Sequence, residues 1–167
     1  GVNTLFNGLL HTPGFDALDF SSLKVVIGGG AAVQRAVAER WKQVTGRYIT
    51  EAYGLTEASP GVSASPLDTP WNGMIGLPFP STEVTLRNED FAALPPWTGD
   101  DDVERHTGEI CVRGPQVMLG YWGKPAETAA VLRDGWLTTG DIGHMNQDGY
   151  ITITDRKKDM ILVSGFN

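Results

Sequence analysis

The sequence has little of several features that mark common protein classes. Its one cysteine, Cys111, cannot form an internal disulfide, and its strand-like surroundings favour a small buried side chain over a nucleophile. Positive charge is scarce, because 13 Lys and Arg stand against 20 Asp and Glu. The net charge of −7 argues against a nucleic acid bound through a basic face and against strong attraction to anionic lipid.

Long apolar runs and the familiar phosphate-binding motifs are also missing. No apolar run reaches about 18 residues, so no membrane span is predicted, and the N-terminus has no signal-peptide pattern. The P-loop pattern G-x-x-x-x-G-K-[ST] does not occur, and Val33 breaks the pattern G-x-G-x-x-G that could begin at Gly28. The chain has no start methionine and stops directly after an apolar, strand-like run, so we expect a fragment of a longer protein.

The first part of the chain alternates strand and helix patterns. Residues 23–27 form a short apolar run that suits a buried strand, and the glycines of residues 28–30 follow it. A helix is predicted over about residues 31–45, with Gly46 as its stop. Residues 48–53 return to a strand pattern, which completes a βαβ unit and predicts a parallel sheet. Four apolar residues define one face of the helix: Val33, Val37, Trp41 and Val44.

The second part of the chain is typical of a β-rich lobe. Residues 83–87 and 109–113 are strand-like, and residues 143–154 predict a hairpin with an Asp-Gly turn. Residues 88–106 are polar and predict a long exposed loop, while residues 125–132 predict a short helix. Several short strands at this spacing indicate a small sheet or barrel.

Together these patterns predict an α/β fold. A parallel-sheet βαβ portion is followed by a small β-rich lobe that resembles a distorted barrel, and the whole is part of a larger enzyme's domain. The predicted boundaries are residues 1–80 for the α/β portion, 81–154 for the β-rich lobe and 155–167 for a hinge and the start of a further domain. A ligand site is expected at the junction of the first two, near Ser81.

The segment Tyr53-Gly54-Leu55-Thr56-Glu57 carries the residue types that a nucleotide site needs. A tyrosine ring can stack on a purine, and Gly54 lets the backbone approach a ligand closely. The Thr56 hydroxyl can donate to a phosphate oxygen, and Glu57 can hold Mg²⁺, which prefers oxygen ligands. The alternative is a turn in which Thr56 is a helix N-cap and Glu57 is a first-turn acid.

The order of motifs along the whole chain resembles the adenylate-forming enzymes, which comprise acyl-CoA synthetases, luciferases and peptide-synthetase adenylation domains. Residues 114–122 and 155–167 are most similar to the bacterial long-chain fatty-acid–CoA ligases. The residues that carry the resemblance are Tyr53-Gly54-Leu55-Thr56-Glu57, Gly108-Glu109-Ile110 with Arg113-Gly114, Gly120-Tyr121-Trp122, Trp136 with Thr139-Gly140-Asp141, and Asp155-Arg156-Lys157-Lys158-Asp159.

The resemblance implies a reaction in two steps. A fatty carboxylate attacks the α-phosphate of ATP, with Mg²⁺ as cofactor, and pyrophosphate leaves. The thiol of coenzyme A then displaces AMP from the acyl-adenylate. Charge that develops on the α-phosphate needs a cation and hydrogen-bond donors directed at it, which is chemistry that the motif residues of this sequence could supply.

The resemblance also implies roles for individual residues in nucleotide binding. Tyr53 stacks on adenine with Gly30 and Ala31 as the opposing wall, and Gly54 and Leu55 complete the segment. Thr56 contacts the α-phosphate and Glu57 carries Mg²⁺. Asp141 accepts both ribose hydroxyls and Arg156 donates on the ribose side, although a plain turn acid and a solvated loop are the alternatives for these two. The implied catalytic residues are Thr56, Glu57 and Arg156.

Further roles concern domain movement, coenzyme A and the acyl chain. Asp155 matches the hinge about which a small C-terminal domain rotates, since such hinges are a few residues that absorb large dihedral changes. Gly165 is expected near the coenzyme A channel. Phe6, Gly28 and Gly29 are expected to border the acyl pocket, with ordinary core packing as an equal alternative for Phe6.

Two parts of the family's machinery are absent from this sequence. The Ser/Thr/Gly-rich phosphate loop lies upstream of the segment that resembles the family, and the lysine of the C-terminal domain lies downstream. We therefore expect the isolated chain to form no adenylate at a useful rate.

Three alternatives stay open from the sequence. The first is another acyl- or aryl-CoA ligase or an amino-acid adenylating domain, the second a non-catalytic nucleotide-binding module, and the third a purely structural domain. The expected partners are small molecules, namely a fatty acid, ATP and coenzyme A, and no nucleic acid is expected. The sequence does not predict an oligomeric state. The full-length protein is expected in the cytoplasm, with peripheral association at the inner membrane left open.

Overall fold

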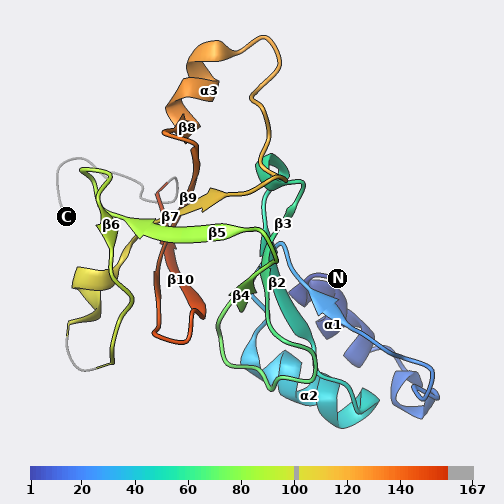
Figure 1. Cartoon of the computed structure of the whole chain (residues 1–167). Coiled ribbons are helices and arrows are strands. Elements are labelled where there is room, and N and C mark those ends of the chain that lie inside the picture. Colours follow the sequence, from blue (N-terminus) through green and yellow to red (C-terminus); the bar gives the residue numbers. More distant parts are fainter. Residues whose placement is uncertain (100–101, 158–167) are drawn as a thin grey trace, which may run out of the picture. The chain divides into compact units, whose positions relative to one another are not determined.

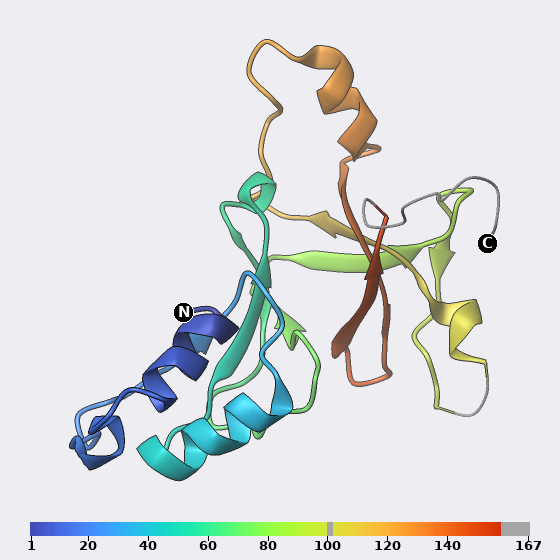
Figure 2. The same ribbon diagram turned by 180° about the vertical axis from the view of Figure 1, so that it is seen from behind.

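The computed structural model describes residues 1–99 and 102–157 (Figures 1 and 2). The chain divides into two compact units, an N-terminal unit of Gly1–Phe79 and a C-terminal unit that begins at Pro80.

The N-terminal unit is built around a four-stranded sheet in the order β1-β2-β3-β4. Strands β1 and β2 are parallel and joined through α2, so the predicted βαβ unit is confirmed, whereas β2, β3 and β4 pair antiparallel. The elements of this unit are α1 (Asn3–Leu10), η1 (Phe15–Ala17), β1 (Ile27–Gly28), α2 (Arg35–Thr45), β2 (Thr50–Gly54), η2 (Thr56–Ala58), β3 (Gly61–Ala64) and β4 (Leu77–Pro78).

Two element boundaries in this unit differ from the sequence prediction. The first strand begins at Ile27 and not at residue 23, because a turn bonds the Leu23 N–H to the Phe20 carbonyl. The helix begins at Arg35 and not near residue 31, because side chains take the N–H groups before it. The Gln34 N–H donates to Asn3 Oδ1 at 2.9 Å, and the Val33 N–H donates to the Glu51 carboxylate.

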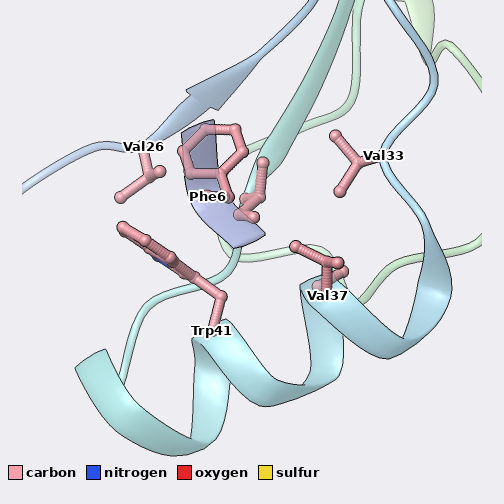
Figure 3. Packing of buried hydrophobic residues seen from close by; sticks show 7 residues of the cluster. Phe6, Val26, Val33, Val37 and Trp41 are labelled. Atoms are coloured by element: carbon pink, nitrogen blue, oxygen red, sulfur yellow. The ribbon is translucent and has the colours of Figure 1, made fainter. Parts of the chain in front are cut away.

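The core of the N-terminal unit lies where α1 and α2 meet the first strands. Phe6 of α1 and Trp41 of α2 pack edge to face with their ring centroids 4.9 Å apart (Figure 3). Val37 and Trp41 are buried, as predicted for the apolar face of the helix. Val44 is only half-buried, and the neighbouring Thr45 is buried. Gly46 ends α2 in the left-handed region at φ 71°, as predicted for a helix stop. The buried cluster consists of Phe6, Val26, Val33, Val37, Ala38, Trp41 and Ile49.

The described part of the C-terminal unit is an antiparallel sheet that curls into a half-barrel, as predicted for the β-rich lobe. Its strand order is β10-β9-β7-β5-β6, with β8 beside β9, and the short helix α3 stands away from the sheet (Figure 1). The elements are β5 (Glu83–Arg87), β6 (Ala93–Leu94), η3 (Val103–His106), β7 (Gly108–Arg113), α3 (Pro125–Val131), β8 (Leu132–Arg133), β9 (Trp136–Met145) and β10 (Ile151–Arg156).

Two expectations for the C-terminal unit are wrong. The predicted loop of residues 88–106 contains β6 and η3. Asp155 and Arg156, which lie beyond the hairpin predicted over residues 143–154, continue β10, where Asp155 pairs with Ile142 and Arg156 with Asp141. Strand β10 lies at the edge of the described sheet, where charged residues are common because one face and one edge meet water.

The buried apolar side chains of the C-terminal unit lie on β5, β7, β9 and β10. Cys111 is fully buried in β7 and burial raises the pKa of its thiol to about 12, which confirms the predicted structural role. Other buried apolar side chains of this unit are Ile110, Val112, Leu137 and Ile151. No helix within the described residues is long and apolar enough to cross a membrane.

Candidate functional site

The predicted nucleotide segment begins inside a strand and ends in a short helical turn. Tyr53 lies in β2 with 7% of its surface exposed, so a base that stacks on it must use that small remaining part or displace a neighbour. Thr56 is exposed and Glu57 is half-buried, both in η2. The N-cap of η2 is Leu55 and makes no side-chain cap bond, so the alternative role of Thr56 as N-cap is wrong.

Gly54 is required by the chain's own backbone. A Cβ at this position would lie 2.0 Å from the Pro60 carbonyl oxygen, and the β2–β3 register shifts between Tyr53 and Gly54. The sequence analysis explained Gly54 by the close approach of a ligand. In the structure, the group that approaches the Gly54 Cβ position is the Pro60 carbonyl. Pro60 also holds Leu55, because the Leu55 N–H donates a hydrogen bond to the Pro60 carbonyl at 2.9 Å.

The glycine turn after β1 lies beside the strand that leads to Tyr53. Gly28 pairs with Glu51 of β2, and a Cβ on Gly29 would lie 2.9 Å from the Ala52 carbonyl oxygen. Gly30 has φ 78°, and a Cβ there would make only an ordinary contact with Val2 Cγ1 at 3.7 Å, so its backbone conformation is the reason for glycine there. The exposed pair Gly30 and Ala31 is therefore placed next to β2 and not covered by it.

Phe6 is 4% exposed and belongs to the core cluster. A Cβ on Gly28 would lie 3.4 Å from the Phe6 ring and 2.8 Å from Val33 and Ile49 side chains. The core-packing alternative for Phe6 is therefore what the structure describes. Its role at an acyl pocket, together with Gly28 and Gly29, stays a prediction.

Glu51 and Trp71 hold the turn before α2 and were not given a role from the sequence. The Glu51 carboxylate accepts the Val33 N–H, and Trp71 Nε1 donates to the Val33 carbonyl at 2.8 Å. Burial raises the pKa of Glu51 to about 7, since the charged form loses its hydration, and the Val33 hydrogen bond opposes this only in part. In the sequence, the only sign of this role was that Glu51 is a single acidic residue within a strand that is otherwise predicted to be buried.

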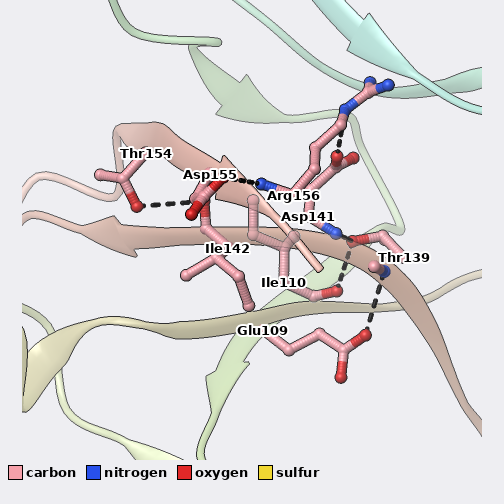
Figure 4. Close-up of polar contacts among 9 residues, drawn as sticks. Glu109, Ile110, Thr139, Asp141, Ile142, Thr154, Asp155 and Arg156 are labelled. Carbon is pink, nitrogen blue, oxygen red and sulfur yellow. Dashed lines mark hydrogen bonds and ion pairs between the residues drawn. The ribbon is translucent and has the colours of Figure 1, made fainter. Parts of the chain in front are cut away.

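The C-terminal unit brings Asp141 and Arg156 together. Asp141 lies in β9 and is 6% exposed, and its Oδ1 is 2.8 Å from Arg156 Nε (Figure 4). A buried carboxylate needs such a partner because an uncompensated buried charge is costly. Arg156 keeps 59% of its side chain exposed, so the ion pair reaches the protein surface although the Asp141 carboxylate is buried. A paired carboxylate and guanidinium can accept from and donate to the hydroxyls of a sugar.

The backbone before Asp141 is held by hydrogen bonds that the sequence did not reveal. The Asp141 N–H donates to Thr139 Oγ1 at 3.1 Å, and that hydroxyl donates to the Ile110 carbonyl at 2.8 Å. The Gly140 N–H donates to Glu109 Oε1 at 3.0 Å (Figure 4). Glu109 was part of a recognised motif without a role of its own.

The predicted hinge residue Asp155 lies in β10 next to an irregularity, because the register with β9 shifts between Ile153 and Asp155. Its carboxylate accepts the Arg156 N–H at 2.7 Å.

Gly165, predicted near the coenzyme A channel, lies outside the described residues. Among residues 1–99 and 102–157 no three His, Cys, Asp or Glu side chains gather as a metal cluster. A metal cluster is not needed for Mg²⁺, because this ion is often held by one carboxylate, such as that of Glu57, together with substrate phosphates and water.

Comparison with known proteins gives a consistent family. A model of the AMP-binding enzymes matches residues 1–122. The chain belongs to the AMP-binding enzyme family. It is 56% identical, over its full length, to a long-chain-fatty-acid–CoA ligase of Yersinia pestis, and 39% identical, again over its full length, to a feruloyl-CoA synthase of Amycolatopsis.

A solved structure extends the likeness to the fold. The crystal structure of ATP-bound MatB from Rhodopseudomonas palustris matches with a TM-score of 0.81 and 32% identity, over 100% of this chain and 32% of that one. The chain spans 28% of the length of the Yersinia relative and 33% of the Amycolatopsis relative. Members of this family use ATP or AMP. The described part of this chain carries the Asp141–Arg156 pair.

Proposed function

We propose that this chain is part of a long-chain fatty-acid–CoA ligase that forms an acyl-adenylate from a fatty acid and ATP and transfers the acyl group to coenzyme A. The observation that carries the proposal is the identity of 56% along the whole chain with a relative of that name. The motif order and, from the structure, the Asp141–Arg156 pair also support it.

In the first step, a carboxylate oxygen of the fatty acid bonds to the α-phosphorus of ATP while the bond to pyrophosphate breaks. We assign the Thr56 hydroxyl, exposed in η2, to donate to an α-phosphate oxygen. Glu57 would hold Mg²⁺, which supplies positive charge to the phosphates when bound. In the second step, the thiol sulfur of coenzyme A bonds to the acyl carbonyl carbon, AMP leaves and the thiol proton is released.

The proposed contacts to the nucleoside are assigned residue by residue within each unit. Asp141 accepts the two ribose hydroxyls and Arg156 donates on the same side. Tyr53 stacks on adenine against Gly30 and Ala31. Support comes from the burial of Asp141, which keeps its carboxylate in one orientation, and from the exposure of Gly30 and Ala31 beside β2. Asp155 is the hinge, and the irregular β9–β10 register beside it supports that role.

The nucleotide part of the proposal is tested by calorimetric titration of this chain with a non-hydrolysable acyl-adenylate analogue. Asp141→Ala should weaken binding by about 1–3 kcal/mol, because the ribose hydroxyls lose a buried acceptor. Asp90→Ala, in the exposed turn between β5 and β6, is the matched control and should bind as the wild type does. Equal binding by wild type and Asp141→Ala would contradict the assignment.

The substrate class is tested on the full-length protein that carries this sequence. Acid-dependent exchange of pyrophosphate into ATP should be fastest with a long-chain acid such as palmitate. A second candidate, an aryl-CoA ligase, rests on the 39% identity with the feruloyl-CoA synthase and predicts faster exchange with ferulate. The purified 167-residue chain itself should give no exchange, and turnover by it would contradict the assignment of essential groups to other parts of the protein.

The partners that this function implies are fatty acid, ATP and coenzyme A. We infer that the full-length protein works in the cytoplasm, with contact to the inner membrane where fatty acids arrive. Separation of a cell lysate into soluble and membrane fractions, followed by immunodetection, tests this location. Recovery of the protein only after detergent extraction would contradict it.

A further inference from the structure

The last residue of β10, Arg156, and the residue that follows it, Lys157, each form an ion pair with a carboxylate on another strand. Arg156 Nε lies 2.8 Å from Asp141 Oδ1 of β9, and Lys157 Nζ lies 2.7 Å from Glu109 Oε2 of β7. Figure 4 shows the Glu109 side chain pointing away from the Asp141–Arg156 pair. This agrees with the alternation of side chains along a strand, because Glu109 is the register partner of Ile142 and not of Asp141. The chain that leaves β10 is therefore attached on both faces of the sheet.

Glu109 uses its second oxygen on the backbone next to Asp141. Glu109 Oε1 accepts the Gly140 N–H at 3.0 Å, and the Lys157 N–H donates to the Gly140 carbonyl at 2.8 Å. Gly140 has φ 78°, a conformation that few other residues adopt. Both polar groups of Gly140 are thus bonded to the Glu109–Lys157 pair, and the orientation of the next residue, Asp141, depends on them.

The burial of Glu109 makes the Lys157 contact important. The Glu109 side chain is 13% exposed and the Lys157 side chain is 48% exposed. Charge-assisted hydrogen bonds are stronger than neutral ones, and a nearly buried carboxylate that loses its cation keeps a desolvation cost that it cannot recover. Breaking this pair should therefore affect the local structure more than breaking an exposed pair would.

We propose that Glu109 is a positioning residue for Asp141, and that the Glu109–Lys157 pair is a latch that holds the chain just beyond Asp155 on the sheet and must open when that chain moves. The roles of Asp141 as ribose ligand and Asp155 as hinge rest on the proposed function. The ion pair and the Gly140 hydrogen bonds are features of the structure and can be tested without activity.

The structural test uses this chain with five variants. Glu109→Gln keeps the Gly140 bond and loses the ion pair, Lys157→Met loses the ion pair from the other side, Glu109→Gln/Lys157→Met combines them, and Glu109→Ala loses both contacts. Glu104→Gln, an exposed acid in η3, is the control. Tryptic cleavage after Arg156, which all variants retain, reports on attachment of the chain end. Hydrogen exchange of the Gly140 and Asp141 amides reports on the turn.

We expect cleavage after Arg156 to rise about 3- to 10-fold in each single latch variant, the range that a hydrogen-bonded ion pair of this burial supports. The double variant should be no faster than either single one, because both remove the same interaction. Glu109→Ala alone should also speed exchange at Gly140. Cleavage unchanged from wild type, or effects that add in the double variant, would overturn the latch.

The kinetic test uses the full-length protein. Glu109→Ala should raise KM for ATP in pyrophosphate exchange about 3- to 10-fold, through misplacement of Asp141, with a smaller change in kcat. Lys157→Met should change the ratio of thioester formation to pyrophosphate exchange by about 3-fold, and Lys157→Arg should restore it. Equal loss of both rates at unchanged KM would mean a merely structural role and would overturn the proposal. If wild type gave no exchange with any acid, the proposed function would fail, while cleavage and hydrogen exchange would still decide the latch.

Discussion

At the scale of single residues, the titration of Glu51 links the turn before α2 to pH. The pKa of Glu51 rises from an ordinary 4.5 to about 7 in the folded chain, because the group is buried. A raised pKa of an acid means that the unfolded chain loses the proton first. Stability is therefore greatest below about pH 4.5 and falls as pH rises to about 7, after which both states are ionised and the loss is constant.

Glu51→Gln removes this dependence, since an amide oxygen can still accept the Val33 N–H without carrying charge. Relative to the variant, the wild type should lose about 2–3 kcal/mol of unfolding free energy between pH 4.5 and pH 7, at 1.36 kcal/mol per pKa unit. Urea unfolding at a series of pH values measures it, with the exposed Glu39→Gln as control. Parallel pH profiles for wild type and Glu51→Gln would show that the Glu51 carboxyl is not buried in this way.

Gly54 gives a second prediction at this scale. Gly54→Ala places a Cβ against the Pro60 carbonyl, so the backbone of β2 or of the following turn must shift. We expect a loss of about 2 kcal/mol or more, and a matching fall in affinity for the acyl-adenylate analogue, because Thr56 and Glu57 follow directly.

Gly61→Ala is the matched control for Gly54. A Cβ there would meet the half-exposed ring of Phe79, a side chain that can rotate away, so the loss should be clearly smaller. Thermal unfolding and calorimetric titration of both variants measure the two effects. Similar losses in the two variants would mean that Pro60 can also give way.

At the scale of elements, the two helices of the N-terminal unit offer glycines with opposite roles. Gly8 lies within α1 with open space at its Cβ position, and Gly46 follows α2 at φ 71°, also in open space. Gly8→Ala should stabilise the chain by about 0.5 kcal/mol, because alanine restricts the unfolded chain and favours helix. Gly46→Ala should destabilise it by about 1 kcal/mol, since alanine is strained in the left-handed region. Urea unfolding of both variants distinguishes these signs, and a gain at Gly46 would contradict its assigned conformation.

Local patterns in the sequence were sufficient for most elements of this fold. The strands around Leu86 and Ile110, the helix around Trp41 and the stop at Gly46 depend on neighbouring residues, and the sequence predicts them. The start of α2 depends on Asn3 and Glu51, which are far from it in the chain, so periodicity placed it too early. The contribution of long-range partners is thus concentrated at element ends.

The same reasoning explains which site residues the sequence could supply. Tyr53, Thr56, Asp141 and Arg156 belong to motifs with a recognisable order, and the pairing of the last two follows from the β9–β10 register. The contact from Lys157 to Glu109 spans 48 positions and joins residues that local pattern assigns to a solvated loop and an ordinary strand. Such a pair becomes visible only when the strand order is known.

At the scale of the whole molecule, each unit has buried side chains of its own. Val62 of β3 in the N-terminal unit and Val112 of β7 in the C-terminal unit are both 0% exposed. Units with separate cores commonly open separately. Substitution of one valine should therefore lower protection in its own unit and leave protection in the other unit unchanged.

Val62→Ala and Val112→Ala are a matched pair, because each removes the same two methyl groups from a fully buried position in a strand. Each should cost roughly 2 kcal/mol, the combined effect of lost apolar burial and a small cavity. Hydrogen exchange followed by mass spectrometry measures protection peptide by peptide, so Val62→Ala should speed exchange within Gly1–Phe79 and Val112→Ala within the described residues after Pro80. If either substitution sped exchange equally in both units, the chain would unfold as one cooperative body, and the effects of Glu51→Gln and Glu109→Gln would then have to be measured as changes in a single stability.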